Sequence, residues 1–336
     1  MRVVYTDPAW ALTEAGQPDS GQADVERAIL EPEVDVEVGQ FDNGYVLSGQ
    51  RLHDAVRGAE ALVIYRCQIT EELVETLEPT CRVVARSGVG IDNLNADLLA
   101  AKGIYGFNIP DYCGDEVSTH TLALLLALER GICVQDRLVR ADRWGIHRGG
   151  VPRRTSIRTV GIVGFGRIGR ASARKLQALY GKVYAYDPYV SADLMASHGV
   201  TEVPSLSDLF GLSDAVVVHA ALTPETTNLI DAKALASARQ GALLVNTARG
   251  KLVDSAAVLE ALEDRRLGGF ASDVFSPEDP NTSPVTRELL LRDDVVVSSH
   301  RAFLSTESEL SLRQRVAAGI RSVLVDGVAP PEGRVA

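Results

Sequence analysis

Short apolar runs alternate with more polar, helix-like segments along the N-terminal third of the chain. The runs lie at residues 3–5, 34–38, 61–65, 82–85 and 104–107. Strands that alternate with helices are typical of a parallel sheet covered by helices on both faces. This part of the chain is therefore predicted to form an α/β domain.

A long apolar helix is predicted next, from about residue 114 to residue 141. Its centre, residues 121–128, is apolar all round, which indicates a buried helix. Residues 149–154, rich in turn formers and charge, separate it from a second series of strands. Those strands are expected at residues 160–163, 183–186, 215–219, 242–246, 269–274 and 295–298, and a last helix at residues 310–324. A chain of 336 residues is long enough for two such domains.

Composition narrows the class of protein and its partners. No apolar run reaches the roughly 18 residues of a membrane span, and the N-terminus enters a strand without a signal-peptide pattern. A cytoplasmic protein without a membrane partner is expected. The net charge of −11 argues against nucleic acid. The four cysteines form no C-x-x-C pair and have no histidine at ligand spacing, so neither a metal site nor a disulfide is expected.

A glycine-rich turn follows the strand at residues 160–163. Residues 164–169 fit G-x-G-x-x-G, open a helix that runs to about residue 179, and precede a strand that ends at Asp187. In such a unit Gly164 makes the tight turn, Gly166 lets the backbone approach a pyrophosphate, and Gly169 lets helix and strand pack closely. The candidate cofactor residues are Gly164, Gly166, Arg167, Ile168, Gly169, Asp187 and Pro188.

The cofactor is predicted to be NAD. Asp187 stands about 20 residues beyond the turn, where an acid accepts hydrogen bonds from the adenosine ribose. Its carboxylate would repel a 2′-phosphate, and no arginine follows at residues 188–190 to bind one. A glycine turn without a ligand is the alternative. A P-loop is disfavoured because no Gly-Lys-Ser/Thr follows.

Three chemically active side chains follow three later strands. Arg249, Glu278 and His300 come after the strands at residues 242–246, 269–274 and 295–298, at the edge that also carries the glycine turn. Arg249 suits a substrate carboxylate and carbonyl, His300 suits proton exchange at a C2 oxygen, and Glu278 suits orientation of the histidine. Taken singly, each has a plainer interpretation, as an ion pair, a solvated acid or a packed histidine.

With these residues the chain resembles the D-isomer-specific 2-hydroxyacid dehydrogenases over nearly its whole length. The resemblance rests on residues 85–93, the glycine turn, residues 245–250, residues 273–275 with Glu278, and His300. Residues 108–113 and 300–303 are most similar to the branch of the C-terminal binding proteins, with some likeness to D-lactate dehydrogenases.

The resemblance implies an architecture and an assembly. A flavodoxin-like substrate domain of residues 1–107 and 302–336 is expected to hold an inserted Rossmann NAD domain of residues 108–301. The family also implies a homodimer, with the apolar helix around residues 122–128 near the interface.

Further site residues are carried over by motif. Asp273, with Thr247 and Ala248, is expected to contact the nicotinamide half of NAD, and Arg249, Glu278 and His300 form the catalytic set. The expected substrate-binding residues are Arg66, Arg86, Ser87, Gly88, Val89, Gly90 and Phe303.

Two departures from the family pattern leave details open. Arg301 and Phe303 stand where many members carry small residues, which places bulk and charge near the pocket. Asp279 precedes the proline after Glu278, so it is the alternative partner of the histidine. Either Arg66 or Arg86 binds a second anionic group, unless both form surface ion pairs.

The sequence therefore predicts an NAD-dependent enzyme that interconverts a D-2-hydroxy acid and its 2-oxo acid. An NAD(H)-sensing interaction protein of the same fold is the alternative, against which the complete set of Arg249, Glu278 and His300 argues. Formate oxidation is less favoured, because a donor without a C2 hydroxyl does not need the acid–base pair.

Overall fold

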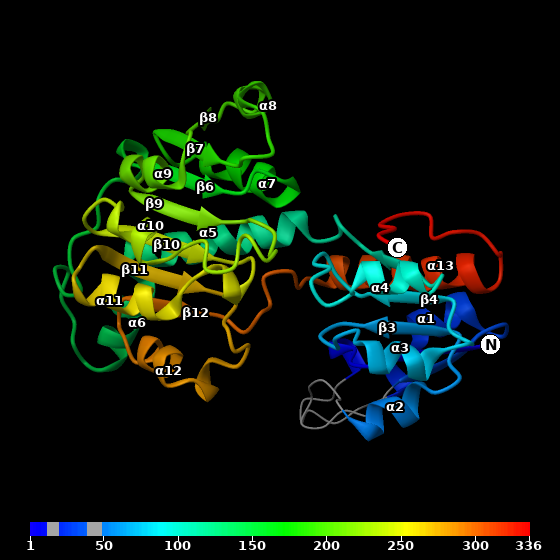
Figure 1. Ribbon diagram of the computed structural model, residues 1–336. Coiled ribbons are helices and arrows are strands. Elements are labelled where there is room, and N and C mark those ends of the chain that lie inside the picture. The colour runs from blue at the N-terminus through cyan, green and yellow to red at the C-terminus, as the bar shows by residue number, and fades with distance from the viewer. Residues whose placement is uncertain (12–19, 39–48) are drawn as a thin grey trace. The chain divides into compact units, whose positions relative to one another are not determined.

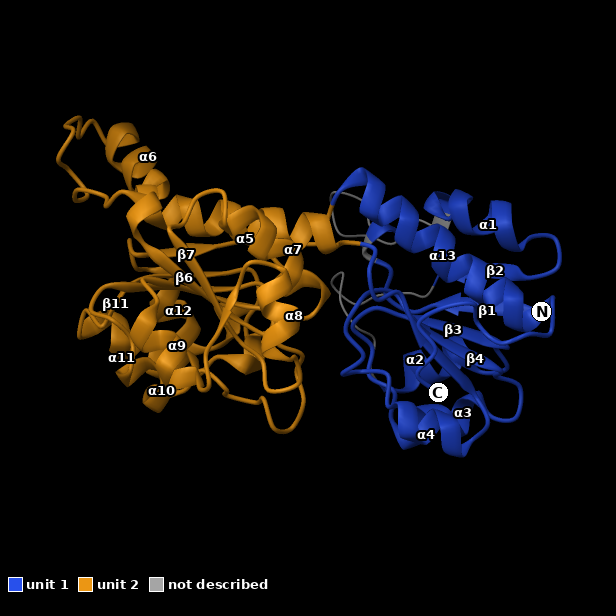
Figure 2. Cartoon of the chain, turned by 90° about the horizontal axis from the view of Figure 1, so that it is seen from above, with its two compact units in different colours: residues 1–112, 305–336 blue, residues 113–304 orange. Residues whose placement is uncertain are grey.

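The computed structural model describes residues 1–11, 20–38 and 49–336. The chain forms two compact units, a first of residues 1–112 with 305–336 and a second of residues 113–304 (Figure 2). The boundaries lie a few residues beyond the expected 107 and 301. Asn108 donates a hydrogen bond to Val89 O at 2.6 Å, which holds it to the first unit, and Ala302 N donates to Asp273 Oδ2 at 2.8 Å, which holds it to the second.

The first unit is a parallel sheet with the strand order β2-β1-β3-β4-β5. Its central strands β3 and β4 lie side by side (Figure 1). Its strands are β1 (Arg2–Tyr5), β2 (Asp35–Val38), β3 (Ala61–Ile64), β4 (Val83–Arg86) and β5 (Tyr105–Asn108). Its helices are α1 (Asp24–Leu30), α2 (Gln50–Val56), α3 (Glu71–Leu77), α4 (Ala96–Ala101) and α13 (Thr306–Leu324), with 3-10 turns η1 (Ala9–Ala11) and η2 (Ser20–Gln22). The order is that of flavodoxin-like folds.

Two apolar cores lie on the two faces of this sheet. Alternate residues of the central strands β1, β3 and β4 enter one core or the other, so these strands read as continuous apolar runs. The C-terminal helix α13 supplies Leu312, Val316 and Ile320 to one of the cores. It begins earlier than expected, because Ser305 caps it by accepting a hydrogen bond from Ser308 N at 2.9 Å.

The second unit is a parallel sheet with the order β12-β11-β10-β9-β6-β7-β8. Its strands are β6 (Thr159–Val163), β7 (Lys182–Tyr186), β8 (Thr201–Glu202), β9 (Ala215–Val218), β10 (Ala242–Asn246), β11 (Leu267–Ser272) and β12 (Val295–Val297). Its helices are α5 (Gly114–Arg130), α6 (Ile132–Arg140), α7 (Arg167–Leu176), α8 (Ala192–Ser197), α9 (Leu206–Leu212), α10 (Ala232–Ala236), α11 (Ser255–Glu263) and α12 (Pro284–Leu290), with 3-10 turns η3 (Thr155–Ile157), η4 (Gly250–Leu252) and η5 (Pro280–Thr282). From β6 the chain adds β7 and β8 on one side of the sheet and then β9 to β12 on the other. Doubly wound sheets bind ligands at such a switch point, which here lies between β6 and β9. The predicted fold class, two parallel-sheet α/β domains, is confirmed.

The long helix expected at residues 114–141 is two helices. Gly131 adopts the left-handed conformation, with φ +61°, and ends α5 before α6 begins. Leu124 and Leu125 of α5 are buried in one core of the second unit. Among the described residues no single helix is long and apolar enough to cross a membrane; α5 and α6 pass that test only as a bent pair, by length and composition.

Candidate functional site

The glycine turn between β6 and α7 leaves room for a dinucleotide. Gly164 has φ +87°, and a Cβ there would lie 2.6 Å from Ala220 N. A Cβ on Gly169 would lie 2.2 Å from Gly164 O, whereas one on Gly166 would meet no atom within 4 Å. No side chain caps α7 at Gly166, so the amides of its first turn are open to an anion. This geometry fits the pyrophosphate of NAD.

Asp187 stands at the end of β7 and folds onto the glycine turn. Its Oδ2 accepts a hydrogen bond from Phe165 N at 2.7 Å, and its Oδ1 accepts one from Tyr189 N at 2.9 Å. A carboxylate has about four acceptor positions, so two are left for hydroxyl groups of a ribose. Its negative charge beside the turn disfavours a 2′-phosphate.

His219 ends β9 and packs against α7. Its Nε2 lies 2.8 Å from the Oγ of the buried Ser172. Burial lowers the pKa of His219 to about 4, so its ring is neutral near pH 7. This contact indicates that His219 serves packing between β9 and α7 rather than chemistry.

Three neighbouring strands deliver the expected catalytic side chains to one edge of the second sheet. Arg249 follows β10, Glu278 follows β11 and His300 follows β12, and these strands are adjacent in the sheet. His300 Nδ1 lies 2.5 Å from Glu278 Oε1. Asp279 instead accepts a hydrogen bond from Asn281 N at 2.9 Å, so the structure pairs the histidine with Glu278 and not with the alternative acid.

The ring of Phe303 stands edge-on to His300, with the ring centroids 6.3 Å apart and the planes at 84°. The neighbouring Arg301 is exposed. Both residues therefore belong to the same turn as the histidine, as the sequence indicated.

The turn that carries Arg249 is held by Asn246, a residue that the sequence analysis did not single out. Asn246 Nδ2 donates to Arg249 O at 2.9 Å, and its Oδ1 accepts from Ala248 N at 3.1 Å. A Cβ on Gly250 would lie 2.0 Å from Phe275 C, so the Arg249 turn packs directly on the loop that leads to Glu278. An asparagine at the end of a wholly apolar strand was the available clue.

Asp273 and Thr247 are both buried. Asp273 accepts hydrogen bonds from the amides of Arg301 at 3.1 Å and Ala302 at 2.8 Å. Thr247 Oγ1 lies 2.7 Å from Thr121 Oγ1 of α5. Asp273 is thus part of the framework that shapes the His300 turn, and Thr247 is held against α5.

In the first unit the expected substrate residues gather at the ends of β3 and β4. The guanidinium groups of Arg66 and Arg86 lie 5.3 and 5.4 Å from the centroid of the Tyr65 ring. Gly88 has φ +144°, and a Cβ there would lie 1.4 Å from Arg86 Nη1, so only glycine fits. Ser87 N donates to Ile64 O at 2.7 Å. Two arginines therefore flank one ring at this edge.

Two side chains clamp the loop that carries Arg66. The carboxylate of Asp7 accepts hydrogen bonds from the amides of Tyr65, Arg66 and Cys67, at 2.9, 2.5 and 3.1 Å. From the other side Asn93 Nδ2 donates to Tyr65 O at 3.1 Å and to Cys67 O at 2.8 Å. The sequence does not reveal this clamp, because an aspartate after a strand can have several structural roles and the residue pattern does not distinguish them.

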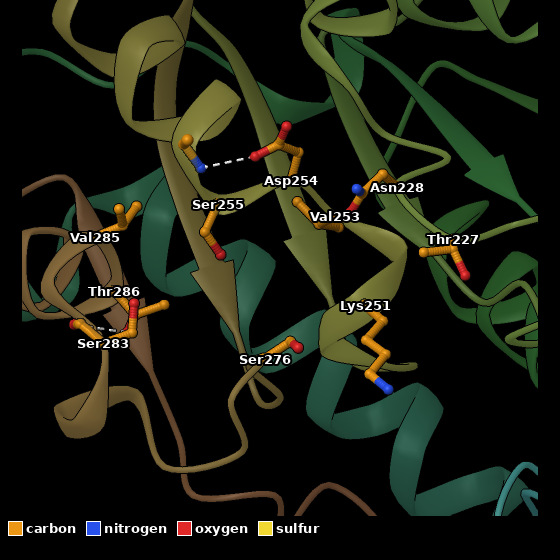
Figure 3. A pocket seen from close by; sticks show the side chains of 11 residues that line it. Thr227, Asn228, Lys251, Val253, Asp254, Ser255, Ser276, Ser283, Val285 and Thr286 are labelled. Carbon is orange, nitrogen blue, oxygen red and sulfur yellow. Dashed lines mark hydrogen bonds between the residues drawn. The ribbon is translucent and has the colours of Figure 1, made fainter.

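A cavity of about 450 Å³ lies beside the loops after β10 and β11, among Lys251, Asp254, Ser276 and Ser283 (Figure 3). None of the expected site residues lines it. Asp254 accepts a hydrogen bond from Ala256 N at 2.9 Å and so already caps α11 with a negative charge. The cavity therefore does not take the place of the strand-end site.

Comparison with known proteins identifies the family. The model of the D-isomer specific 2-hydroxyacid dehydrogenase NAD binding domain matches residues 122–302, more than half of the chain. The chain belongs to this family, and the predictions of family, fold class and NAD as cofactor are confirmed. Membership of the C-terminal binding protein branch stays a prediction.

Curated relatives are identical to this chain at about a third of the aligned positions. The D-3-phosphoglycerate dehydrogenase of Mycobacterium tuberculosis is 36% identical over 287 residues, which cover 83% of this chain and 52% of that protein. The chain thus spans about half the length of the curated phosphoglycerate dehydrogenases that it matches. The (S)-sulfolactate dehydrogenase of Chromohalobacter salexigens is 35% identical over 288 residues, covering 84% of this chain and 90% of that protein.

Solved structures of similar fold include D-lactate dehydrogenases. The Escherichia coli enzyme aligns over 100% of both chains with a TM-score of 0.78 and 26% identity. The Aquifex aeolicus enzyme, solved with NAD and lactic acid, aligns over 98% of this chain and 100% of its own, with a TM-score of 0.83. At 24% identity that likeness concerns the fold.

Proposed function

We propose that this protein is an NAD-dependent oxidoreductase that interconverts a D-2-hydroxy acid and its 2-oxo acid. The observation that carries the proposal is the contact between His300 Nδ1 and Glu278 Oε1. These residues follow β12 and β11, and Arg249 follows β10, the next strand of the same sheet. This is an acid–base pair beside a cation that binds a carboxylate, at the edge that also carries the dinucleotide turn. An NAD(H) sensor has no need of such a pair, so that alternative is not favoured.

Each side chain has a defined task in the reduction of the 2-oxo acid. Arg249 binds the substrate carboxylate and polarises the carbonyl oxygen. NADH, when bound, supplies the hydride to C2. His300 donates a proton from Nε2 to the C2 oxygen, since its Nδ1 faces Glu278. The Glu278 carboxylate stabilises positive charge on the ring and fixes its orientation.

The substrate that we propose carries a second anionic group. Arg66 and Arg86 flank Tyr65 at the edge of the first sheet, and the Asp7–Asn93 clamp fixes the backbone that carries Arg66. The names of two relatives, phosphoglycerate and sulfolactate dehydrogenase, each denote a hydroxy acid with a second anion. A fixed pair of guanidinium groups suits a phosphate or a sulfonate.

A substrate panel tests this function. Glyoxylate, pyruvate, hydroxypyruvate, phosphohydroxypyruvate and sulfopyruvate are each incubated with the protein and either NADH or NADPH, and oxidation is followed at 340 nm. We expect turnover with NADH, and higher kcat/KM for the acids with a second anionic group. Tight NADH binding without turnover of any acid would contradict the function. Equal kcat/KM for pyruvate and the dianionic acids would contradict only the substrate class.

The protein is further proposed to act as a homodimer in the cytoplasm, with a small 2-hydroxy or 2-oxo acid as its other partner and neither nucleic acid nor a membrane. Leu124 and Leu125 are used in the core of the second unit, so the exposed apolar side chains after α5 are the better candidate for the interface. Trp144 and Ile146 are 80% and 86% exposed there. Sedimentation of wild type and a Trp144→Asp variant tests the dimer.

The four free cysteines agree with a reducing compartment, which cell fractionation tests.

A further inference from the structure

A hydrogen-bonded chain runs from helix α5 to the buried carboxylate of Asp273. His120 Nε2 lies 2.8 Å from Ser298 Oγ, and Ser298 Oγ lies 2.5 Å from Asp273 Oδ1. His120 Nε2 is itself 3.6 Å from the same Oδ1. In the sequence His120 stands just before the apolar centre of the long helix expected at residues 114–141. The structure gives it a specific partner.

The hydrogens that each group carries determine which atom donates in each of these hydrogen bonds. A carboxylate oxygen only accepts, so the Ser298 hydroxyl donates its single hydrogen to Asp273. The contact between His120 and Ser298 then needs a hydrogen on His120 Nε2. His120 therefore donates to Ser298, and Ser298 donates to Asp273.

The end of the chain is a fully buried anion that shapes the His300 turn. The Asp273 side chain has no exposed surface, and Arg301 N, Ala302 N and Ser298 Oγ all donate to it. The Asp273 backbone oxygen also accepts from His300 N at 2.7 Å. His300 has φ +53°, an uncommon conformation that these contacts maintain. A buried carboxylate is stable only when hydrogen-bond donors surround it. His120 orients one of these donors, the Ser298 hydroxyl, and so it also affects the conformation of the His300 turn.

The next residue of the same helix contacts the other catalytic turn. Thr121 Oγ1 lies 2.7 Å from Thr247 Oγ1, two residues before Arg249. Two consecutive residues of α5 thus contact the end of β12 and the end of β10. The helix serves as a common support for the turns that carry His300 and Arg249.

We propose that His120 is a positioning residue that acts through Ser298 on Asp273. It holds the Asp273 carboxylate and the His300 turn in the geometry required on the nicotinamide side of the site. The inference rests on the proposed function for the roles of Asp273 and His300. It adds His120, a residue of α5 that does not touch the reacting atoms, to the residues on which catalysis depends.

The test compares ligands with and without a nicotinamide. His120→Phe removes the donor and keeps a ring, His120→Gln keeps an amide donor near the position of Nε2, and Ser298→Ala breaks the middle of the chain. His53→Phe is the matched control, because His53 Nδ1 also contacts a hydroxyl, Thr76 Oγ1 at 2.5 Å, but in the first unit. Calorimetry measures the Kd of NADH and of ADP-ribose for each variant, and steady-state kinetics measure kcat and KM.

For His120→Phe we expect about tenfold weaker NADH binding and about tenfold lower kcat, which is the upper end of what one hydrogen bond between neutral groups contributes. The Kd of ADP-ribose and the KM of the 2-oxo acid should stay within about twofold, and His120→Gln should recover most of the loss. Because the two residues act in one chain, the double variant should be little worse than Ser298→Ala alone. His53→Phe should leave all four quantities unchanged.

Three results would overturn the proposal. Equal loss of NADH and ADP-ribose affinity would show a purely structural role, unchanged NADH affinity would show no role, and multiplied effects in the double variant would show independent actions. If His120→Phe does not fold, Ser298→Ala and His120→Gln decide the question. Absence of wild-type turnover would refute the proposed function, while the ratio of the two Kd values would still decide this inference.

Discussion

Replacing Glu278 by glutamine removes the negative charge from the side chain that contacts His300 and keeps its length. A hydrogen bond between charged partners contributes about 1.5–3 kcal/mol. The Glu278 side chain is 42% exposed and that of His300 is 19% exposed, so solvent screening places the effect near the lower end. A loss of about 1.5–2 kcal/mol of transition-state stabilisation corresponds to roughly a 10- to 30-fold fall in kcat/KM.

The assay is the initial rate of NADH oxidation with the best 2-oxo acid of the panel, with the Kd of NADH measured in parallel. Asp279→Asn is the matched control, since this neighbouring acid contacts Asn281 and not the histidine. It should keep kcat/KM within about twofold. A fall of less than twofold for Glu278→Gln, or a larger fall for Asp279→Asn, would refute the assignment of Glu278.

Two further changes test the cofactor side of the site, and a third tests the pH dependence of stability. Gly169→Ala places a methyl group 2.2 Å from Gly164 O and should weaken NADH binding at least about tenfold by calorimetry; Gly114→Ala, where a Cβ meets nothing, is the control, and equal affinities would contradict the packing argument. Asp187→Ser should raise the ratio of kcat/KM for NADPH over NADH by about tenfold or more, since a repelling charge is lost; an unchanged ratio counts against this role. The pKa of His219, lowered to about 4 by burial, means that the unfolded chain takes up the proton first as the pH falls below about 6.5. Wild type should therefore lose up to about 3 kcal/mol of unfolding free energy from this group between pH 6.5 and pH 4, and His219→Asn should lose less. The unfolding free energies come from denaturant titrations at each pH. An equal fall with pH in the two proteins would contradict the shift.

Strand periodicity and the glycine turn predicted most of the architecture. Buried parallel strands such as β3 and β9 are apolar throughout, so they can be predicted from the sequence without knowledge of how their side chains pack. The break at Gly131 was missed because the apolar stripe continues from α5 into α6. The compact units divide at residue 112, five residues beyond the expected 107, because contacts such as Asn108 to Val89 tie the intervening residues to the first unit.

Site residues were predictable where topology alone brings them together. Arg249, Glu278 and His300 follow adjacent parallel strands, so their common edge follows from the strand order. The choice of Glu278 over Asp279 depends on the path of one loop, which no periodicity encodes. His120 was not recognised because its partner Ser298 lies 178 residues away in the sequence.

The central claim, hydride transfer at C2, is tested most directly with NADH deuterated at the transferable C4 position. The protein is incubated with this cofactor and the best 2-oxo acid of the panel, and the product is analysed by NMR and chiral chromatography. The account predicts a D-2-hydroxy acid with one deuterium on C2, and no product above background from His300→Ala. A product without deuterium at C2, an L-configured product, or no product from wild type that binds NADH tightly would contradict it.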